Sequence, residues 1–319
     1  MNGRDLAIVV NGLSRKFGDI RAVEDLTFSV QRGELFGLLG PDGAGKTTTL
    51  RMLAGILKPS AGDAAVNGKS VVREPEAVKH EIAYMSQRFG LYTDLTVLEN
   101  ITFYADLYLV PFEERPARIE RLFAFSNLGQ FQDRLAGALS GGMKQKLGLS
   151  CALIHQPSVL LLDEPTFGVD PVSRRDLWMI IHEMVGQGTT VLASTSYMDE
   201  AERFDRLAML DRGRLRALDT PDSLREKLEV EIVAVTTGEA RQARSIALEI
   251  SGVLNATVFG GSLHLAVASA GEMAPKIHAE LTRRGIEVLD IRSLPPGMED
   301  VFIDYTTRSR RNREGGEMP

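Results

Sequence analysis

The chain of 319 residues contains one cysteine, no long apolar run and no surplus of basic residues. A single cysteine cannot form an internal disulfide, and because Cys151 lies in an apolar, helix-like stretch, we expect it to be a buried core residue. No run of about 18 or more apolar residues occurs, and residues 1–10 lack the basic stretch and apolar core of a signal peptide. These absences predict a protein that stays in the cytoplasm.

The charge balance is slightly acidic, with 43 acidic against 37 basic residues and a formal net charge of −6. Proteins that wrap nucleic acid usually carry a basic surplus, so this balance argues against a nucleic-acid partner. The exception is the C-terminal tail, where four arginines precede a Gly-rich end: Arg308, Arg310, Arg311 and Arg313. We expect residues 306–319 to be a disordered tail that is either solvated or in contact with anionic lipid.

Length and hydrophobic patterning predict two domains of different size. The chain is about twice as long as a typical domain, and its composition changes at Pro221. We expect a first domain over residues 1–220, with a helical insertion over about 88–157. Residues 221–305 show strand and helix patterns in the order βαββαβ, which predicts a small α+β accessory domain.

Two apolar strands of the first domain end in residues that can carry chemistry. Residues 35–39 are expected to form a strand that runs directly into a Gly-rich loop and then into a helix. Residues 159–162 form a continuous apolar run that ends in Asp163 and Glu164, as expected of a buried parallel strand with acids at its carboxyl end. The expected fold class is therefore α/β.

The Gly-rich loop has the pattern of a P-loop. Its residues are Gly40, Pro41, Asp42, Gly43, Ala44, Gly45, Lys46 and Thr47, followed by Thr48. Glycines at these positions let backbone amides point inward around phosphate oxygens at the amino terminus of a helix. We expect Lys46 to reach the β- and γ-phosphates of a nucleotide and Thr47 to ligate Mg²⁺.

A second Gly-containing segment distinguishes among the classes of P-loop protein. It is Leu139-Ser140-Gly141-Gly142-Met143-Lys144-Gln145, upstream of the strand that ends in Asp163. Such a segment can place a helix amino terminus, with the Ser140 hydroxyl and two glycine amides, against a γ-phosphate. With the P-loop before it and Leu160-Leu161-Leu162-Asp163-Glu164-Pro165 after it, the chain over residues 6–220 resembles the ATP-binding subunits of ABC transporters.

The resemblance implies a fold, two cofactors and a partner subunit. The fold is the P-loop NTPase fold of the ABC ATPase type, with a mixed sheet core and a helical subdomain, and the cofactors are ATP and Mg²⁺. In this family the segment that corresponds to residues 139–145 is called the signature segment. Two such subunits meet head to tail, so that each ATP lies between the P-loop of one and the signature segment of the other. The resemblance therefore implies a homodimer, or a heterodimer with a second ABC ATPase.

Individual residues take implied roles from their match to the family's motifs. Asp163 is implied to hold Mg²⁺, and Glu164 to be the general base that polarises the attacking water. Gln87 is implied to contact both Mg²⁺ and that water. Phe17 is implied to stack on adenine, with core packing as the alternative. Asp170 is implied to cross the dimer interface, and an N-cap for the following helix is equally compatible with its position.

Ser196 departs from the family's pattern at a catalytic position. Most members carry a histidine there, which bonds the γ-phosphate and orders the catalytic water. Serine can donate one hydrogen bond, but it reaches less far and cannot be cationic. We therefore expect a slow site, in a subunit that pairs with a second ATPase carrying the histidine. A module that binds ATP and scarcely hydrolyses it is the further alternative, against which Glu164 argues.

The implied function is ATP-driven transport through separate membrane subunits, with the chain held peripherally on the inner face of the cell membrane. Apolar residues near Gln87, namely Phe89, Leu91 and Tyr92, are expected to receive those permease subunits. The resemblance to the ABC-2 type drug-efflux branch favours export of drugs or other hydrophobic compounds. The alternative is a soluble ABC ATPase acting on ribosomes or DNA, whose usual tandem domains or long coiled coil are not seen in this sequence.

Overall fold

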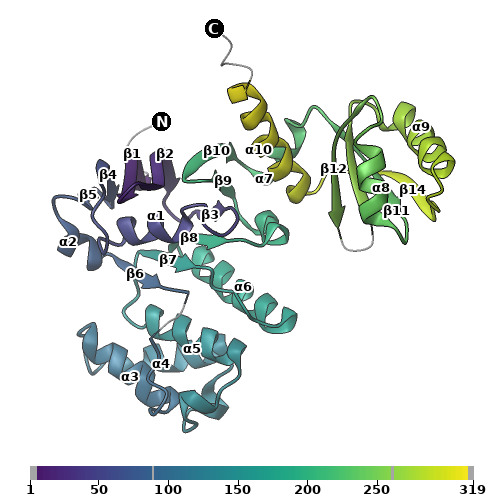
Figure 1. Ribbon diagram of the computed structural model, residues 1–319. Helices are drawn as coiled ribbons and strands as arrows, with labels where there is room; N and C mark the ends of the chain where they lie inside the picture. The colour runs from purple at the N-terminus through teal and green to yellow at the C-terminus, as the bar shows by residue number, and fades with distance from the viewer. Residues whose placement is uncertain (1–5, 88–89, 260–261, 315–319) are drawn as a thin grey trace. The chain divides into compact units, whose positions relative to one another are not determined.

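The computed structural model describes residues 6–87, 90–259 and 262–314, with side chains described up to residue 307 (Figure 1). The chain separates into two compact units, with the division between Thr220 and Pro221. We call residues up to 220 unit 1 and residues from 221 onward unit 2, and each is described by itself. Within the described ranges, no helix is both long and apolar enough to cross a membrane.

The first sheet of unit 1 is antiparallel, with strand order β2-β1-β4-β5. Its strands are β1 (Leu6–Phe17), β2 (Ile20–Gln31), β4 (Ala61–Val66) and β5 (Lys69–Ser70). Along β1 and β2 buried and exposed residues broadly alternate, which is the pattern of a sheet that covers a core with one face. Two aromatic side chains on the buried side of β2 and β3, Phe28 and Phe36, stack with their centroids 5.4 Å apart.

The second sheet of unit 1 is mixed, with strand order β10-β9-β3-β8-β7-β6. Its strands are β3 (Leu35–Leu39), β6 (Ile82–Met85), β7 (Val159–Asp163), β8 (Thr190–Thr195), β9 (Arg206–Asp211) and β10 (Arg214–Asp219). All neighbours are parallel except β9 and β10, which form an antiparallel hairpin. Every residue of β3, β7 and β8 is buried, as expected of parallel strands covered on both faces. The predicted mixed α/β core is confirmed.

Helices cover the core and also form a group between β6 and β7. Helix α1 (Lys46–Leu53) packs Leu50, Met52 and Leu53 into the core shared by the two sheets, and α6 (Pro171–Gly186) contacts β8. The short α2 (Pro75–Lys79) precedes β6. Between β6 and β7 lie α3 (Val97–Leu107), α4 (Arg115–Ser126) and α5 (Gly141–Leu153), which gather into one group in Figure 1.

Unit 2 is an antiparallel sheet with order β12-β13-β11-β14 and two helices packed on its core. Its elements are α7 (Pro221–Glu226), β11 (Glu231–Thr236), α8 (Ala240–Ala247), β12 (Val253–Phe259), β13 (Ser262–Val267), α9 (Ala270–Arg283), β14 (Asp290–Leu294) and α10 (Met298–Glu314). From β11 to β14 the order of strands and helices is βαββαβ. Helix α10 continues through residue 314, so the prediction of a disordered tail from residue 306 is wrong for residues 306–314.

Candidate functional site

Several of the residues that the sequence predicts to carry the chemistry lie at one edge of the mixed sheet. Strands β3, β7 and β8 are parallel neighbours, so the loops at their carboxyl ends lie side by side. A cavity of about 590 Å³ opens there. It is lined by residues 42–48 of the Gly-rich loop together with Ile20, Arg21, Ala22, Gln87, Glu164, Phe167 and Arg212.

The Gly-rich loop has a backbone that only glycine fits without strain or collision. Gly43 and Gly45 have φ values of 76° and 101°, in the left-handed region. A Cβ on Gly45 would lie 2.6 Å from the carbonyl oxygen of Ala22, and one on Gly40 would lie 2.4 Å from that of Leu210. The loop therefore passes close to neighbouring backbone and delivers the chain into α1.

Helix α1 begins at Lys46 and has no acidic residue in its first turn. The first N–H groups of a helix have no acceptor within the helix, and the helix dipole adds positive charge at that end. Residues 42–48, which line the cavity, include this amino terminus. The arrangement suits a polyanion such as the phosphates of a nucleotide.

Lys46 and Glu164 form a buried ion pair at the base of the cavity. The Lys46 Nζ lies 2.9 Å from Glu164 Oε1 and donates hydrogen bonds to the carbonyl oxygens of Gly40, at 2.7 Å, and Pro41, at 3.1 Å. Gln87 Nε2 donates to the other carboxylate oxygen of Glu164 at 3.3 Å. Glu164 itself has a φ of 48°, which is uncommon for a residue with a side chain and is typical of functional sites.

Asp163 is buried beside this pair and accepts three hydrogen bonds from side chains. Its Oδ1 accepts from Thr47 Oγ1 at 3.0 Å and from Ser194 Oγ at 2.8 Å, and its Oδ2 accepts from the Tyr84 hydroxyl at 3.4 Å. Burial, followed by the nearby Asp163 carboxylate, raises the pKa of Tyr84, which keeps its hydroxyl a donor. Ser194 Oγ also accepts from the backbone N–H of Glu164 at 3.0 Å and so links β8 to the end of β7.

The pairing of Thr47 with Asp163 fits a magnesium site. Mg²⁺ prefers oxygen ligands and is usually held by one or two protein groups, with water and substrate phosphates completing its octahedron. A hydroxyl and a carboxylate that already lie 3.0 Å apart, with Thr47 lining the cavity of about 590 Å³, provide that set of donors.

The signature segment forms a second, separate feature of unit 1. Ser140 is the N-cap of α5, and its Oγ accepts from the N–H of Met143 at 3.3 Å. Asp170 is the N-cap of α6, which is one of the two roles that its place in the sequence allows. Its side chain accepts a hydrogen bond from the N–H of Ser173 at 2.9 Å. That hydrogen bond lowers the pKa of Asp170.

The two helix starts pack directly against each other. A Cβ on Gly142 would lie 2.3 Å from Ser173 Oγ, so only glycine allows this approach. Ser140, Gly141, Gly142 and Asp170 are not among the described residues that line the cavity of the Gly-rich loop.

Two predicted residues also lie outside the described lining of the cavity. Phe17 is 45% exposed, and the guanidinium carbon of Arg15 lies 4.6 Å from the centroid of its ring. Ser196 is half-buried in the bend that follows β8. Phe89 falls outside the described residues, whereas Tyr92 is exposed and packs edge-on against Phe103.

Sequence reasoning missed several residues that the fold brings to the cavity. Arg212 lies in the tight turn of the β9–β10 hairpin, and the next residue, Gly213, donates its N–H to the carbonyl of Ala44 at 3.0 Å. Ile20 and Phe167 add apolar surface. The only local signal was the turn composition around Gly213, which indicates a hairpin but not its contact with the P-loop.

Two family models match the chain. The model described as "ABC transporter" matches residues 23–167, and the model of the DrrA1-3-like ATP-binding protein C-terminal domain matches residues 220–306. The second match covers most of unit 2.

Curated relatives match over nearly the whole chain. It is 43% identical over 304 residues to the probable multidrug ABC transporter ATP-binding protein YbhF of Escherichia coli, covering 94% of this chain and 52% of that protein. It is 36% identical to the daunorubicin resistance ATP-binding protein DrrA3 of Streptomyces coeruleorubidus, covering 97% of this chain and 99% of that one. A Nod factor export ATP-binding protein I of Bradyrhizobium diazoefficiens is 35% identical with the same coverage. The chain thus spans about half the length of YbhF.

Solved structures agree with these matches. An ATP-binding subunit of an ABC transporter superposes with a TM-score of 0.63 at 32% identity, covering 69% of this chain and 92% of that one. CbiO1 of Clostridium perfringens shares the fold, with a TM-score of 0.64 at 24% identity over 77% of this chain and 96% of its own. The Lys46–Glu164 and Thr47–Asp163 pairs agree with these matches. The chain belongs to the family of ABC transporter ATP-binding proteins.

Proposed function

We propose that this chain is the ATP-binding and ATP-hydrolysing subunit of an ABC transporter that exports drugs or other hydrophobic compounds. The observation that carries the proposal is the meeting of Lys46, Thr47 and Glu164 at one cavity, with the buried Asp163 hydrogen-bonded to Thr47. A lysine and a helix amino terminus bind phosphates, a hydroxyl and a carboxylate bind a divalent cation, and a carboxylate can serve as general base. Together these are the parts that phosphoryl transfer to water requires.

The Gly-rich loop is assigned to the phosphates of ATP. Backbone amides of residues 40–48 would surround the phosphate oxygens, with the Lys46 ammonium placed against the β- and γ-phosphates. Thr47 and Asp163 would hold Mg²⁺, with Gln87 beside them. When bound, Mg²⁺ supplies positive charge that offsets the negative charge developing on the transferred phosphoryl group.

Glu164 is assigned as the general base, and the ion pair with Lys46 controls when it can act. In this structure the carboxylate is engaged by Lys46 on one oxygen and by Gln87 on the other. When Lys46 turns to a phosphate, Glu164 loses that partner and is free to accept a proton from water. The base is thereby activated by occupancy of the phosphate site.

The signature segment is assigned to the nucleotide of a partner subunit. Ser140 and Gly141 are exposed at the start of α5, away from the lining of this chain's own cavity. A helix start without a phosphate partner in its own chain fits a head-to-tail dimer, in which each subunit completes the other's site. Asp170, at the neighbouring helix start, would lie in the same interface.

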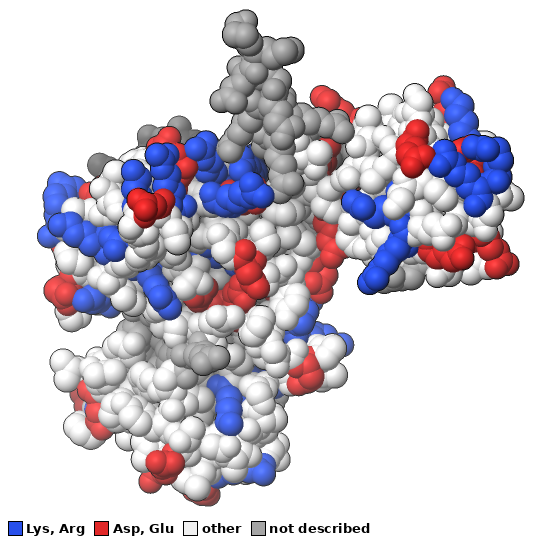
Figure 2. All heavy atoms as spheres, in the orientation of Figure 1, with Lys and Arg blue, Asp and Glu red and all other residues white. Residues whose placement is uncertain are grey.

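Export with membrane subunits is supported by the relatives and by the surface of the helical insertion. The relatives that this chain matches are named as multidrug, daunorubicin resistance and Nod factor export proteins. Leu109 and Phe112, between α3 and α4, are 86% and 76% exposed, and in Figure 2 the part of the surface formed by the insertion is mostly uncharged. We assign this surface, together with Tyr92, to contact with permease subunits at the inner face of the membrane.

A second candidate function is the weakly hydrolysing half of an asymmetric pair of ATPases. Ser196 favours it, because a hydroxyl in the bend after β8 reaches less far toward a phosphate than the usual histidine. Phe17 keeps its assignment to adenine in both candidates, since it is 45% exposed and pairs at the end of β1 with Ile20, which lines the cavity.

The test is ATP turnover by the purified chain with Mg²⁺, alone and with its membrane subunits in vesicles, beside Glu164→Gln and the control Glu183→Gln on the exposed side of α6. The proposal expects Glu164→Gln to lose at least about 100-fold in turnover while still binding ATP, and the control to keep its turnover. Turnover that appears only when a second ATPase subunit is added would select the asymmetric pair. Turnover unaffected by Glu164→Gln would refute the assignment of the base.

A further inference from the structure

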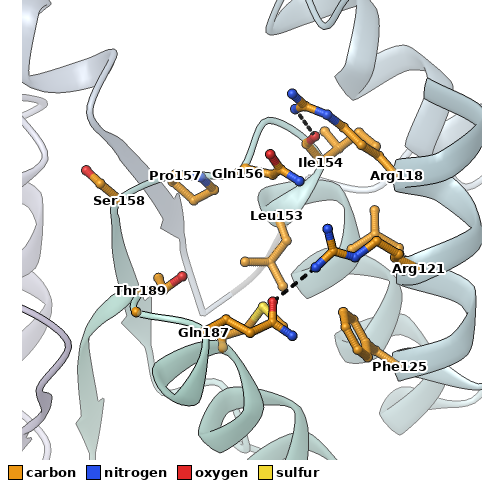
Figure 3. Close-up of a pocket in the computed structure, with 13 residues that line it drawn as sticks. Arg118, Arg121, Phe125, Leu153, Ile154, Gln156, Pro157, Ser158, Gln187 and Thr189 are labelled. Atoms are coloured by element: carbon orange, nitrogen blue, oxygen red, sulfur yellow. Dashed lines mark hydrogen bonds between the residues drawn. The ribbon is translucent and has the colours of Figure 1, made fainter. Parts of the chain in front are cut away.

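A second cavity in unit 1 has no role in the chemistry proposed above. It has a volume of about 510 Å³ and is bounded by α4, the loop after α5 and the turn between α6 and β8 (Figure 3). Small-molecule sites typically have about 300–1,000 Å³, so the size is sufficient for a ligand. Its base is apolar, formed by the side chains of Leu122, Phe125, Leu153 and Met184.

The rim of this cavity is positively charged. Arg118 and Arg121 are three residues apart on α4 and therefore share one face of the helix, and Figure 3 shows both reaching across the cavity. None of the thirteen described residues that line it is acidic. Ser158 and Thr189 lie on the opposite wall, where the Ser158 hydroxyl bonds to Asn67 and to the backbone carbonyl of Glu81.

The two arginines differ in how firmly they are already engaged. Arg118 donates to the carbonyl oxygen of Ile154 at 2.9 Å and pairs with Glu114, which lies outside the cavity. The hydrogen bond of Arg121 runs to an uncharged partner, Gln187 Oε1, at the long distance of 3.4 Å. Hydrogen bonds between charged groups are roughly twice as strong as those between neutral groups. Arg121 can therefore exchange its weak, uncharged acceptor for an anion at little cost.

We propose that this cavity binds an amphipathic organic anion, with its carboxylate, sulfonate or phosphate head on Arg121 and its apolar body against the base. The planar guanidinium can donate to two oxygens of such a head group, and the apolar base can pack against the apolar body of the ligand. An apolar ligand without charge would leave Arg121 with the same weak partner, whereas an inorganic anion would leave the base exposed to water. The cavity therefore favours the combination of both features in one molecule.

The site is distinct from the nucleotide cavity. Ser158 and Thr189 immediately precede β7 and β8, whereas Asp163 and Ser194 lie at the opposite ends of those strands. Five residues of strand separate the two ends, roughly 17 Å at 3.3 Å per residue. A ligand there would contact α4 and the starts of both strands without touching a residue assigned to ATP.

The test uses two dyes with the same rings, 1-anilinonaphthalene-8-sulfonate and its uncharged analogue N-phenyl-1-naphthylamine, titrated into the full chain without nucleotide or Mg²⁺. We expect one sulfonate site per chain, bound at least about tenfold more tightly than the neutral dye. Because no step of ATP hydrolysis is involved, failure here leaves the proposed function untouched.

Variants then locate the bound dye. Arg121→Glu is expected to weaken sulfonate binding at least tenfold, and Arg121→Lys to recover part of it. The control Arg241→Glu, at an exposed arginine on α8 of unit 2, makes the same charge change and should stay within about twofold of the parent. Arg121 is exposed, so its variants are expected to fold, which circular dichroism checks. Equal affinity for the two dyes, or equal effects of Arg121→Glu and Arg241→Glu, would overturn the proposal.

Discussion

Replacing Glu200 with alanine is expected to destabilise unit 1 by roughly 3–6 kcal/mol. Glu200 is buried, and its carboxylate accepts three hydrogen bonds, from Thr166 Oγ1 at 2.8 Å, Trp178 Nε1 at 2.9 Å and Thr195 Oγ1 at 2.6 Å. These donors come from three different segments of the chain. Removing their shared acceptor leaves each buried donor unpaired, at about 1–2 kcal/mol apiece for these uncharged donors.

The single tryptophan of the chain makes this loss measurable. Trp178 is fully buried in α6, so its fluorescence during urea unfolding reports on unit 1 alone. With an m-value of about 3 kcal/mol/M, the expected loss lowers the unfolding midpoint by about 1–2 M. Glu200→Gln retains one carbonyl oxygen with two lone pairs, so at least one donor stays unpaired and about half the effect is expected.

The exposed Glu183, on the same helix as Trp178, provides the matched control. Glu183→Ala removes a carboxylate without breaking a buried contact and should change stability by no more than about 0.5 kcal/mol. If Glu200→Ala lies within about 1 kcal/mol of that control, then the three buried hydrogen bonds do not stabilise unit 1 and the argument fails.

Three further outcomes follow from the structure. Ser196→His is expected to raise ATP turnover severalfold, because an imidazole reaches further toward a phosphate, and a brisk parent rate left unchanged by it would contradict the slow-site hypothesis. Burial raises the pKa of the Cys151 thiol, so iodoacetamide at about pH 8 should label the native chain far more slowly than the urea-unfolded chain, and equal rates would show that the thiol is accessible. Gly142→Ala places a methyl group 2.3 Å from Ser173 Oγ and should cost about 1–3 kcal/mol of stability, much of which Ser173→Gly in the same chain restores; strictly additive effects would show that the two do not collide.

Elements with a strong local pattern could be predicted from the sequence, and the others could not. Strands β3 and β7 are unbroken apolar runs, and unit 2 alternates strand and helix patterns clearly enough to give its order. Strands β4 and β6 were missed. The first is built largely of small residues with little strand preference, and the second has only four residues. Both are strands because neighbouring strands pair with them.

The candidate site shows the same division. Sequence motifs indicate the chemistry of four residues, and the structure brings these residues together: Lys46, Thr47, Asp163 and Glu164. Arg212 comes to the same cavity from a distant hairpin, because Gly213 bonds to the P-loop backbone, and no local pattern contains that contact. The helix at the end of the chain was missed for a different reason. Its arginine-rich composition is typical of disordered tails, so the sequence did not indicate that α10 continues to residue 314.

The place of β3 in the middle of the mixed sheet has a consequence for how the chain folds as it is synthesised. One edge of β3 pairs with β8 and the other with β9, so Gly33 bonds to Thr190, 157 residues later, and Leu35 to Asp205, 170 residues later. Both edges of this wholly apolar strand therefore stay unpaired until most of unit 1 has left the ribosome. The strand that precedes the P-loop thus exposes two unpaired, apolar edges in the nascent chain, and it needs protection from aggregation until β8 and β9 have been synthesised.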